Sequence, residues 1–201
     1  NTGYQKSKKA ESLSSPAYNP YVVAVGASDS KKTAILVDDV VPSFSPWPKH
    51  AGSSRSVDLV APGAQMQGLR VPGSFNELMY ESGKVGDRYF RGSGTSESAA
   101  IVSGAAALIL QKYPTATPDQ VKALLTSTGY KILGKAQAMG GGELQLAKAL
   151  ATALPSATQT WPSSTGTGSL ELARGSDHLS INGVVLSGEK DIFGHAYDAA
   201  A

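Results

Sequence analysis

The sequence of 201 residues contains no cysteine, which excludes disulfide bonds and metal sites built from thiolates. This absence leaves the cellular compartment open, because cytosolic and secreted proteins are both compatible with it. The most apolar stretch, residues 98–110, falls well short of the roughly 20 residues that a bilayer-spanning helix needs. We therefore expect this stretch to lie in a protein core, and we predict no membrane span.

An excess of one charge is also lacking. The sequence has 18 Lys and Arg against 16 Asp and Glu, which gives a net charge of +2. A charge this small and dispersed predicts no nucleic-acid partner. Hydrophobic residues make up 41% and charged residues 17% of the chain, a balance typical of a soluble globular protein and not of a disordered one.

Several functional motifs are missing. There is no Gly-x-Ser-x-Gly, which disfavours an α/β-hydrolase, and there is no phosphate-binding loop or cluster with metal-ligand spacing. Residues 28–31 (SDSK) have the Ser-x-x-Lys spacing of penicillin-binding enzymes, but they lie in a polar turn without a helix to direct the lysine. The chain begins with Asn1, and its start lacks the pattern of a signal peptide. We expect either a cleaved N-terminus or a partial sequence.

The segments that are present predict alternating strands and helices. Residues 21–27 (YVVAVGA) read as a strand buried on both faces, and shorter strands are expected at 57–60 and 67–71, with a short extended piece at 88–91. Residues 73–94 otherwise read as a loop. Helices are predicted at 96–113, packed on all faces, at 118–126 and at 143–154. Thr117, Pro118 and Gln120 form the pattern of a capping box at the start of the second helix.

The composition changes towards the C-terminus. Residues 155–168 are rich in Pro, Ser, Thr and Gly, which indicates a linker after a domain that ends at residue 154. Beyond it, residues 169–201 form a small appendix in which Asn182-Gly183 lies between two apolar runs, a strong signal for a two-residue β-hairpin.

A candidate for chemistry precedes the apolar helix. Residues 92–98 (GSGTSES) place Ser96 at or beside its N-terminus. In one interpretation Thr95 or Ser96 is only an N-cap that accepts hydrogen bonds from free backbone N–H groups. In the other, those N–H groups and the helix dipole stabilise an oxyanion that forms beside the Ser96 hydroxyl. The local sequence does not separate the two.

Four segments taken together resemble the subtilisin-like serine peptidases. They occur in that family's order between residue 1 and about residue 150: residues 1–3 (NTG), 15–27 (SPAYNPYVVAVGA), 43–45 (SFS) followed by 57–63 (VDLVAPG), and 94–108 (GTSESAAIVSGAAAL). The resemblance implies an α/β fold with a mainly parallel sheet, of which this chain would be the C-terminal part.

The resemblance also implies roles for single residues. Ser96 matches the nucleophile, and Asn1 matches the asparagine whose side-chain amide stabilises the oxyanion beside the Ser96 N–H. Ser14 is expected near the pocket for the substrate residue that precedes the cleaved bond. Calcium often accompanies the family, but carboxylates such as Asp38 and Asp39 look too isolated to place it, so we predict no cofactor or metal site in this chain.

The catalytic Asp and His of the family precede the oxyanion asparagine, so neither is expected in this sequence. His50, His178 and His195 lack the family's catalytic-histidine surroundings, and we interpret them as structural or surface residues. The chain departs from the pattern at Ala100-Ile101, where a helix is still compatible, and at Glu97, where the family usually has Met. A carboxylate there opposes the oxyanion unless it points to solvent or pairs with a cation.

We therefore interpret the chain as the nucleophile-bearing part of a secreted serine endopeptidase that acts on polypeptides, with the upstream part of the same protein as partner. The localisation rests on the resemblance alone. The alternative is a catalytically inactive homologue, or a fragment that acts as a binding module through its hairpin.

Overall fold

The computed structural model describes residues 13, 16–17, 19–47, 55–160, 168–171 and 178–198. It divides the chain into two compact units, residues 1–159 and 160–201, and each is described here by itself. The boundaries expected from composition, at residues 154 and 168, stay predictions.

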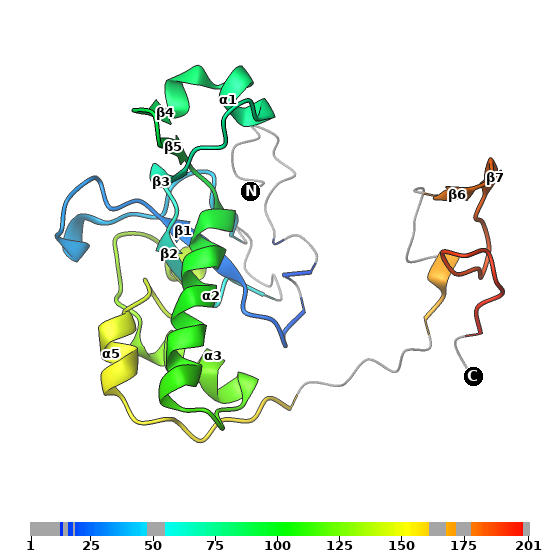
Figure 1. Ribbon diagram of the computed structural model, residues 1–201. Helices are drawn as coiled ribbons and strands as arrows, with labels where there is room; N and C mark the ends of the chain where they lie inside the picture. Colours follow the sequence, from blue (N-terminus) through cyan, green and yellow to red (C-terminus); the bar gives the residue numbers. More distant parts are fainter. Residues whose placement is uncertain are drawn as a thin grey trace. The chain divides into compact units, whose positions relative to one another are not determined.

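A pair of parallel strands lies at the centre of the first unit. Strand β1 (Val25–Ser28) pairs in parallel with β2 (Leu59–Pro62), with Val25 opposite Leu59. Both strands consist mainly of small and β-branched residues, and most of their side chains are buried. The long helix α2 (Thr95–Lys112) packs against both strands (Figure 1). The predicted α/β fold with a parallel sheet is confirmed.

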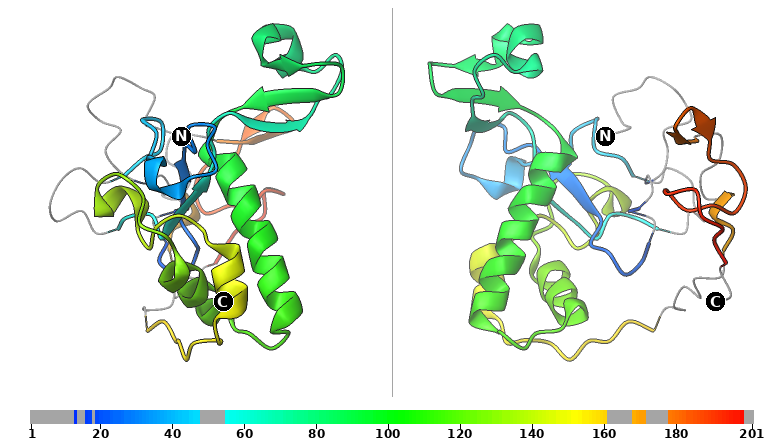
Figure 2. Two further views of the ribbon diagram at one scale, coloured as in Figure 1. Left: turned by 90° about the vertical axis from the view of Figure 1, so that its left-hand side faces the viewer. Right: turned by 45° about the vertical axis from the view of Figure 1, so that its right-hand side comes forward.

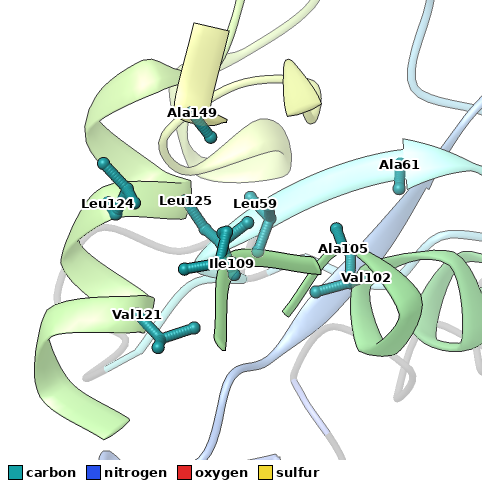
Figure 3. Packing of buried hydrophobic residues seen from close by; sticks show 9 residues of the cluster. All are labelled: Leu59, Ala61, Val102, Ala105, Ile109, Val121, Leu124, Leu125 and Ala149. Carbon is teal, nitrogen blue, oxygen red and sulfur yellow. The ribbon is translucent and has the colours of Figure 1, made fainter. Parts of the chain in front are cut away.

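Helices α3 (Pro118–Thr128) and α5 (Leu146–Ala151) complete the packing around α2. Apolar side chains from these helices and from β2 meet in one core (Figure 3): Leu59, Ala61, Val102, Ala105, Ile109, Val121, Leu124, Leu125 and Ala149. The predicted capping box is present at the start of α3, where Thr117 and Gln120 bond each other's backbone N–H. The core therefore holds α2 against the parallel strands along most of its length.

Some boundaries differ from those predicted. The strand expected at 21–27 begins only at Val25, because Tyr21 and Val22 are exposed in a turn. Strand β2 begins at Leu59 and continues through Pro62, whereas the strand was expected at 57–60. The helix expected at 143–154 is the shorter α5, because the residues before it bond to β2. Helix α2 buries one face within the described residues, and not every face as predicted, since Leu108 and Leu110 are exposed.

An antiparallel sheet extends from the end of β2. It consists of β3 (Met66–Leu69), β5 (Tyr89–Gly92) and β4 (Lys84–Val85), with β5 in the middle. Residues 73–94 were expected to be mostly loop, but they contain the short helix α1 (Phe75–Met79), the 3-10 helix η2 (Glu81–Gly83) and strand β4. The sheet projects past the N-terminal end of α2 and carries α1 at its tip (Figure 2). Two other short elements of this unit are η1 (Leu36–Asp38) and α4 (Ala136–Met139).

The second unit contains the predicted hairpin. Strands β6 (Ser180–Ile181) and β7 (Val184–Val185) pair antiparallel around Asn182 and Gly183. Both turn residues have positive φ angles, 50° and 79°, as a two-residue turn that matches the strand twist requires. The hairpin prediction is confirmed.

Candidate active site

Ser96 is the second residue of α2, and its side chain is exposed. The N-cap is Gly94, which has an extended backbone and no side chain to cap with, so neither Thr95 nor Ser96 holds the N-cap position. The first N–H groups of a helix have no partner within the helix itself, so Ser96 lies at its positive end, where backbone donors point away from the helix. A hydroxyl here is available to a bound molecule.

The start of α2 is fixed to the end of β2 by two hydrogen bonds. Ser98 is completely buried, and its hydroxyl lies 2.9 Å from the carbonyl oxygen of Ala61, to which it donates. The Gly94 N–H donates to the Gly63 carbonyl at 2.8 Å. A Cβ atom at Gly63 would lie 2.2 Å from the Ser98 hydroxyl oxygen, so only glycine fits there. Ser96, between Gly94 and Ser98, is therefore held by rigid neighbours.

This anchor lies at the carboxyl edge of the parallel strands. The Gly63 N–H donates to the carbonyl of Ser28, the last residue of β1, at 3.0 Å. Ligands of open parallel sheets bind at the carboxyl ends of the strands, which is where α2 begins. The buried Ser45 supports β1 from the side, since its hydroxyl accepts the Ala27 N–H at 2.9 Å.

A cleft of about 820 Å³ opens between the projecting sheet and the first turn of α2. Its lining comes from Gln65, from the segment with α1 and η2, from β5 with the residue that follows it, and from the start of α2. The lining residues are Gln65, Asn76, Tyr80, Ser82, Gly83, Phe90, Arg91, Gly92, Ser93 and Glu97. A second cleft of about 360 Å³ is lined in part by β3 and shares Gln65 and Arg91 with the first. Glu97, which lines the larger cleft, directly follows Ser96 in the sequence.

Glu97 is half-buried and lines the larger cleft, and within the described residues it lacks the cation partner that was expected to make its charge harmless. Its Oε2 atom is buried and has no hydrogen-bond partner. Among the described residues no Lys, Arg or His lies within ion-pair distance of it. The carboxylate therefore has no side-chain cation as partner in this part of the chain, although it lies in the first turn of α2, at the positive end of the helix.

A second acidic group is buried beneath the parallel strands. Asp39 and Glu143 are each 2% exposed, and the Ser28 hydroxyl donates to Glu143 Oε1 at 2.5 Å. Burial raises the pKa of Glu143 to about 7, with a hydrogen bond to Asp39 acting in the same direction and the Ser28 hydroxyl opposing it. Asp39, which looked isolated in the sequence, thus faces a carboxyl group 104 positions away in the chain. In the part of the chain that the structure describes, no group of three or more His, Cys, Asp or Glu is arranged to hold a metal ion.

The other residues singled out in the sequence lie in the second unit or outside the described residues. Asn1, Ser14 and His50 lie outside the described residues, so the roles predicted for Asn1 and Ser14 stay predictions. In the second unit, His178 lies 3.6 Å from Glu171 and His195 lies 3.2 Å from Asp191. Each of these two histidines therefore has a carboxylate neighbour within its own unit. Among the described helices none is long and apolar enough to cross a membrane.

Sequence reasoning missed the residues that fix the site. Ser98 and Gly63 act through contacts between segments far apart in the chain, and only the small size of both residues hinted at close packing. The cleft could not be foreseen either, because α1 and η2 were expected to be loop.

Comparisons with known proteins agree on one family. The model of the subtilase family, peptidase S8, matches residues 1–168. The serine protease AprX of Bacillus subtilis is 41% identical over 116 residues, which are 58% of this chain and 26% of that protein. Mycosin-2 of Mycobacterium tuberculosis is 32% identical over 152 residues, 75% of this chain and 25% of that protein. The chain thus spans about a quarter of the length of these curated relatives.

Solved structures give the same result. Fervidolysin from Fervidobacterium pennivorans, a keratinolytic enzyme related to subtilisin, superposes with a TM-score of 0.54 at 29% identity. The match covers 78% of this chain and 21% of that structure. MycP1 from Mycobacterium smegmatis gives a TM-score of 0.52 at 27% identity, over 76% of this chain and 36% of the other.

Proposed function

The chain belongs to the subtilase family, and from this premise we propose that it carries the nucleophile of a serine-type endopeptidase, Ser96. The observation that supports this most directly is the exposed Ser96 hydroxyl in the first turn of a helix whose cap is supplied by Gly94. The hydroxyl is not used to cap the helix and remains available to a substrate. Free N–H groups and the helix dipole beside it favour the negative charge that develops during acyl transfer.

In the proposed reaction the Ser96 oxygen attacks the carbonyl carbon of the scissile peptide, and a histidine accepts the hydroxyl proton. The C–N bond then breaks, the leaving amine takes the proton from the histidine, and an acyl ester remains on Ser96. Water hydrolyses this ester with the same histidine as base, which frees the acid product and restores the hydroxyl. An aspartate orients the histidine throughout.

The other groups of the proposed site bind the substrate and stabilise the oxyanion. The backbone N–H of Ser96 and the side-chain amide of Asn1 donate to the oxyanion, and Ser14 contacts the substrate residue before the cleaved bond. The histidine and aspartate come from sequence upstream of Asn1, because no segment of the 201 residues matches the family's Asp-bearing or His-bearing motifs. The substrate is a polypeptide, and we propose that the protein works outside the cell, as the resemblance to secreted proteases suggests.

A serine-reactive fluorophosphonate probe and a chromogenic peptide test the proposal in a chain extended to include the upstream Asp and His motifs. We expect labelling and hydrolysis that Ser96→Ala abolishes. Ser103→Ala is the matched control, because Ser103 lies on the same helix, is exposed, and bonds only the Ala99 carbonyl within that helix. The 201-residue chain alone should hydrolyse no peptide, and steady turnover by it would show that the base has been misplaced.

A second candidate is an inactive homologue that acts as a binding module. It is favoured by the buried carboxylate oxygen of Glu97 and by exposed apolar residues of the second unit, such as Val184, Ile192 and Phe193. The upstream sequence separates the candidates: Asp-Ser/Thr-Gly and His-Gly-Thr segments support the peptidase, and their absence supports the module.

A further inference from the structure

The cleft beside Ser96 contains a single carboxylate and a single cation among its described lining residues, Glu97 and Arg91. Its volume of about 820 Å³ lies within the range of sites that bind small molecules or large side chains. Polar groups of Asn76, Tyr80 and Ser82 line the rest of its wall. The cleft therefore offers hydrogen-bonding groups around one carboxylate that is not paired with the cation of the same cleft.

Glu97 directs its carboxylate to the β5 side of this cleft. A Cβ atom placed on Gly92 would lie 3.8 Å from Glu97 Oε1, in ordinary contact, while Oε2 is buried without a hydrogen-bond partner. A carboxylate oxygen removed from water without a partner is costly, and that cost is relieved when a cation binds.

The neighbouring cations of the projecting sheet are already paired with other acids. Arg70 bonds Glu77, and Lys84 lies 3.7 Å from Glu77 and 3.4 Å from Glu81. Arg91 lines the cleft with an exposed side chain, but it forms no ion pair with Glu97. Within the described residues, no Lys, Arg or His side chain forms an ion pair with Glu97.

We infer that Glu97 makes this cleft a subsite for a basic side chain, lysine or arginine, of the polypeptide substrate. The inference rests on the proposed function of Ser96. Consecutive Cα atoms are about 3.8 Å apart, so a substrate side chain that reaches Glu97 belongs to a residue close to the bond that Ser96 attacks. The same ion pair cancels the charge that would otherwise oppose the oxyanion, so the basic residue improves turnover as well as binding.

Peptide hydrolysis by the extended chain tests the inference. Pairs of peptides carry either lysine or its uncharged analogue norleucine at each position within three residues of the cleaved bond. At one of these positions we expect lysine to raise kcat/KM about 10- to 100-fold, a range typical of a hydrogen-bonded charge pair. Glu97→Gln should reduce this ratio to within about threefold, and Arg91→Gln should increase it by removing a competing cation. An unchanged ratio in Glu97→Gln would overturn the inference.

Equilibrium binding separates this result from failure of the proposed function. In a Ser96→Ala background, where no turnover is expected, the lysine peptide should still bind about tenfold more tightly than the norleucine peptide. The difference should disappear in the double variant with Glu97→Gln and persist with the control Glu81→Gln, which removes an acid of η2 that does not line the cleft. If the lysine peptide binds more tightly but the extended chain hydrolyses neither peptide, the proposed peptidase function is wrong and the subsite is supported. If both peptides bind equally, the subsite is wrong.

Discussion

The hydroxyl of Ser28, at the end of β1, donates a 2.5 Å hydrogen bond to Glu143, 115 residues further along the chain. The backbone of Glu143 in turn exchanges two hydrogen bonds with the backbone of Tyr130: the Glu143 N–H donates to the Tyr130 carbonyl at 2.7 Å, and the Tyr130 N–H donates to the Glu143 carbonyl at 2.9 Å. A carboxyl group thus joins the parallel strands to the segment that leads into α5. Asp39 faces the same group, so two acids share a buried space that no described cation enters.

This arrangement predicts that the protein loses stability as the pH rises. Burial raises the pKa of Glu143 from 4.5 to about 7, so between these values the folded chain keeps a proton that the unfolded chain releases. Because the folded state binds more protons there, the free energy of unfolding should fall by on the order of 3 kcal/mol from about pH 4.5 to pH 7 and then level off.

Glu143→Gln should remove most of that dependence, since an amide can still accept from Ser28 and donate to Asp39 without ionising. Urea unfolding at pH 5 and pH 8 measures the effect, and the variant should exceed the parent in stability at pH 8. A parent protein that is equally stable at both pH values would contradict the prediction.

Gly63→Ala should damage the site and the fold together. The new Cβ atom would meet the Ser98 hydroxyl at 2.2 Å and the Gly94 carbonyl at 2.7 Å, so the start of α2 must shift. We expect a loss of about 1–3 kcal/mol, as for overpacked cores, and reduced fluorophosphonate labelling of Ser96. Gly104→Ala is the control, because no atom lies within 4 Å of its added Cβ and alanine favours a helix. Equal labelling of the two variants would show that the anchor does not position Ser96.

Asp58→Asn should destabilise the first unit. Asp58 accepts hydrogen bonds from Arg55 at 2.9 Å and from the Ala24 N–H at 2.7 Å, and it lies 3.4 Å from Lys122. Burial lowers the pKa of Lys122, and Asp58 opposes that shift, so its loss leaves two cations with little compensation.

The side chains of Asp58, Arg55 and Lys122 are only 12–13% exposed, so we expect a cost of about 2–3 kcal/mol in denaturant unfolding. Lys31→Gln breaks an exposed pair with Asp29 and should cost at most about 0.5 kcal/mol. Similar losses in both variants would show that the buried cluster contributes no more than a surface pair.

Helix α2 should be sensitive on one face only. Ile109 is completely buried in the core, whereas Leu110 is 43% exposed. Ile109→Ala should therefore cost about 2–5 kcal/mol, and Leu110→Ala well under half of that. Thermal melts of the two variants check the difference, and a larger loss for Leu110→Ala would mean that other parts of the protein cover that face.

The sequence predicted best those features that depend on neighbouring residues. The box of Thr117 and Gln120 and the turn at Asn182-Gly183 are local chemistry, and both are present at the predicted residues. Helix α1 was missed because it is short and is held by Glu77, whose partners Arg70 and Gly73 lie outside the helix. Asp39 was misjudged because its neighbour Glu143 is distant in the chain.

The candidate site was predicted in the same uneven way. Ser96 stood out through the motif around it, which carries the family resemblance. Its support could not be read from the sequence, since the bonds from Ser98 to Ala61 and from Gly94 to Gly63 join strands and helix across the fold. The charge of Glu97 was noticed, but the burial of its Oε2 atom arises only in the folded chain and is not encoded in the motif around Ser96.

The bond between Gly94 and Gly63 closes the chain on itself, so residues 64–93 leave and return through one fixed point (Figure 2). We expect this bond to hold the first turn of α2, with Ser96, in place when the outer part of residues 64–93 changes. Lengthening, shortening or replacing the segment around α1 should change which molecules the protein binds and leave the geometry at Gly63 and Gly94 unchanged. Residues 64–93 are therefore a suitable segment to replace when a new recognition segment is engineered, because the bond between Gly94 and Gly63 joins their two ends.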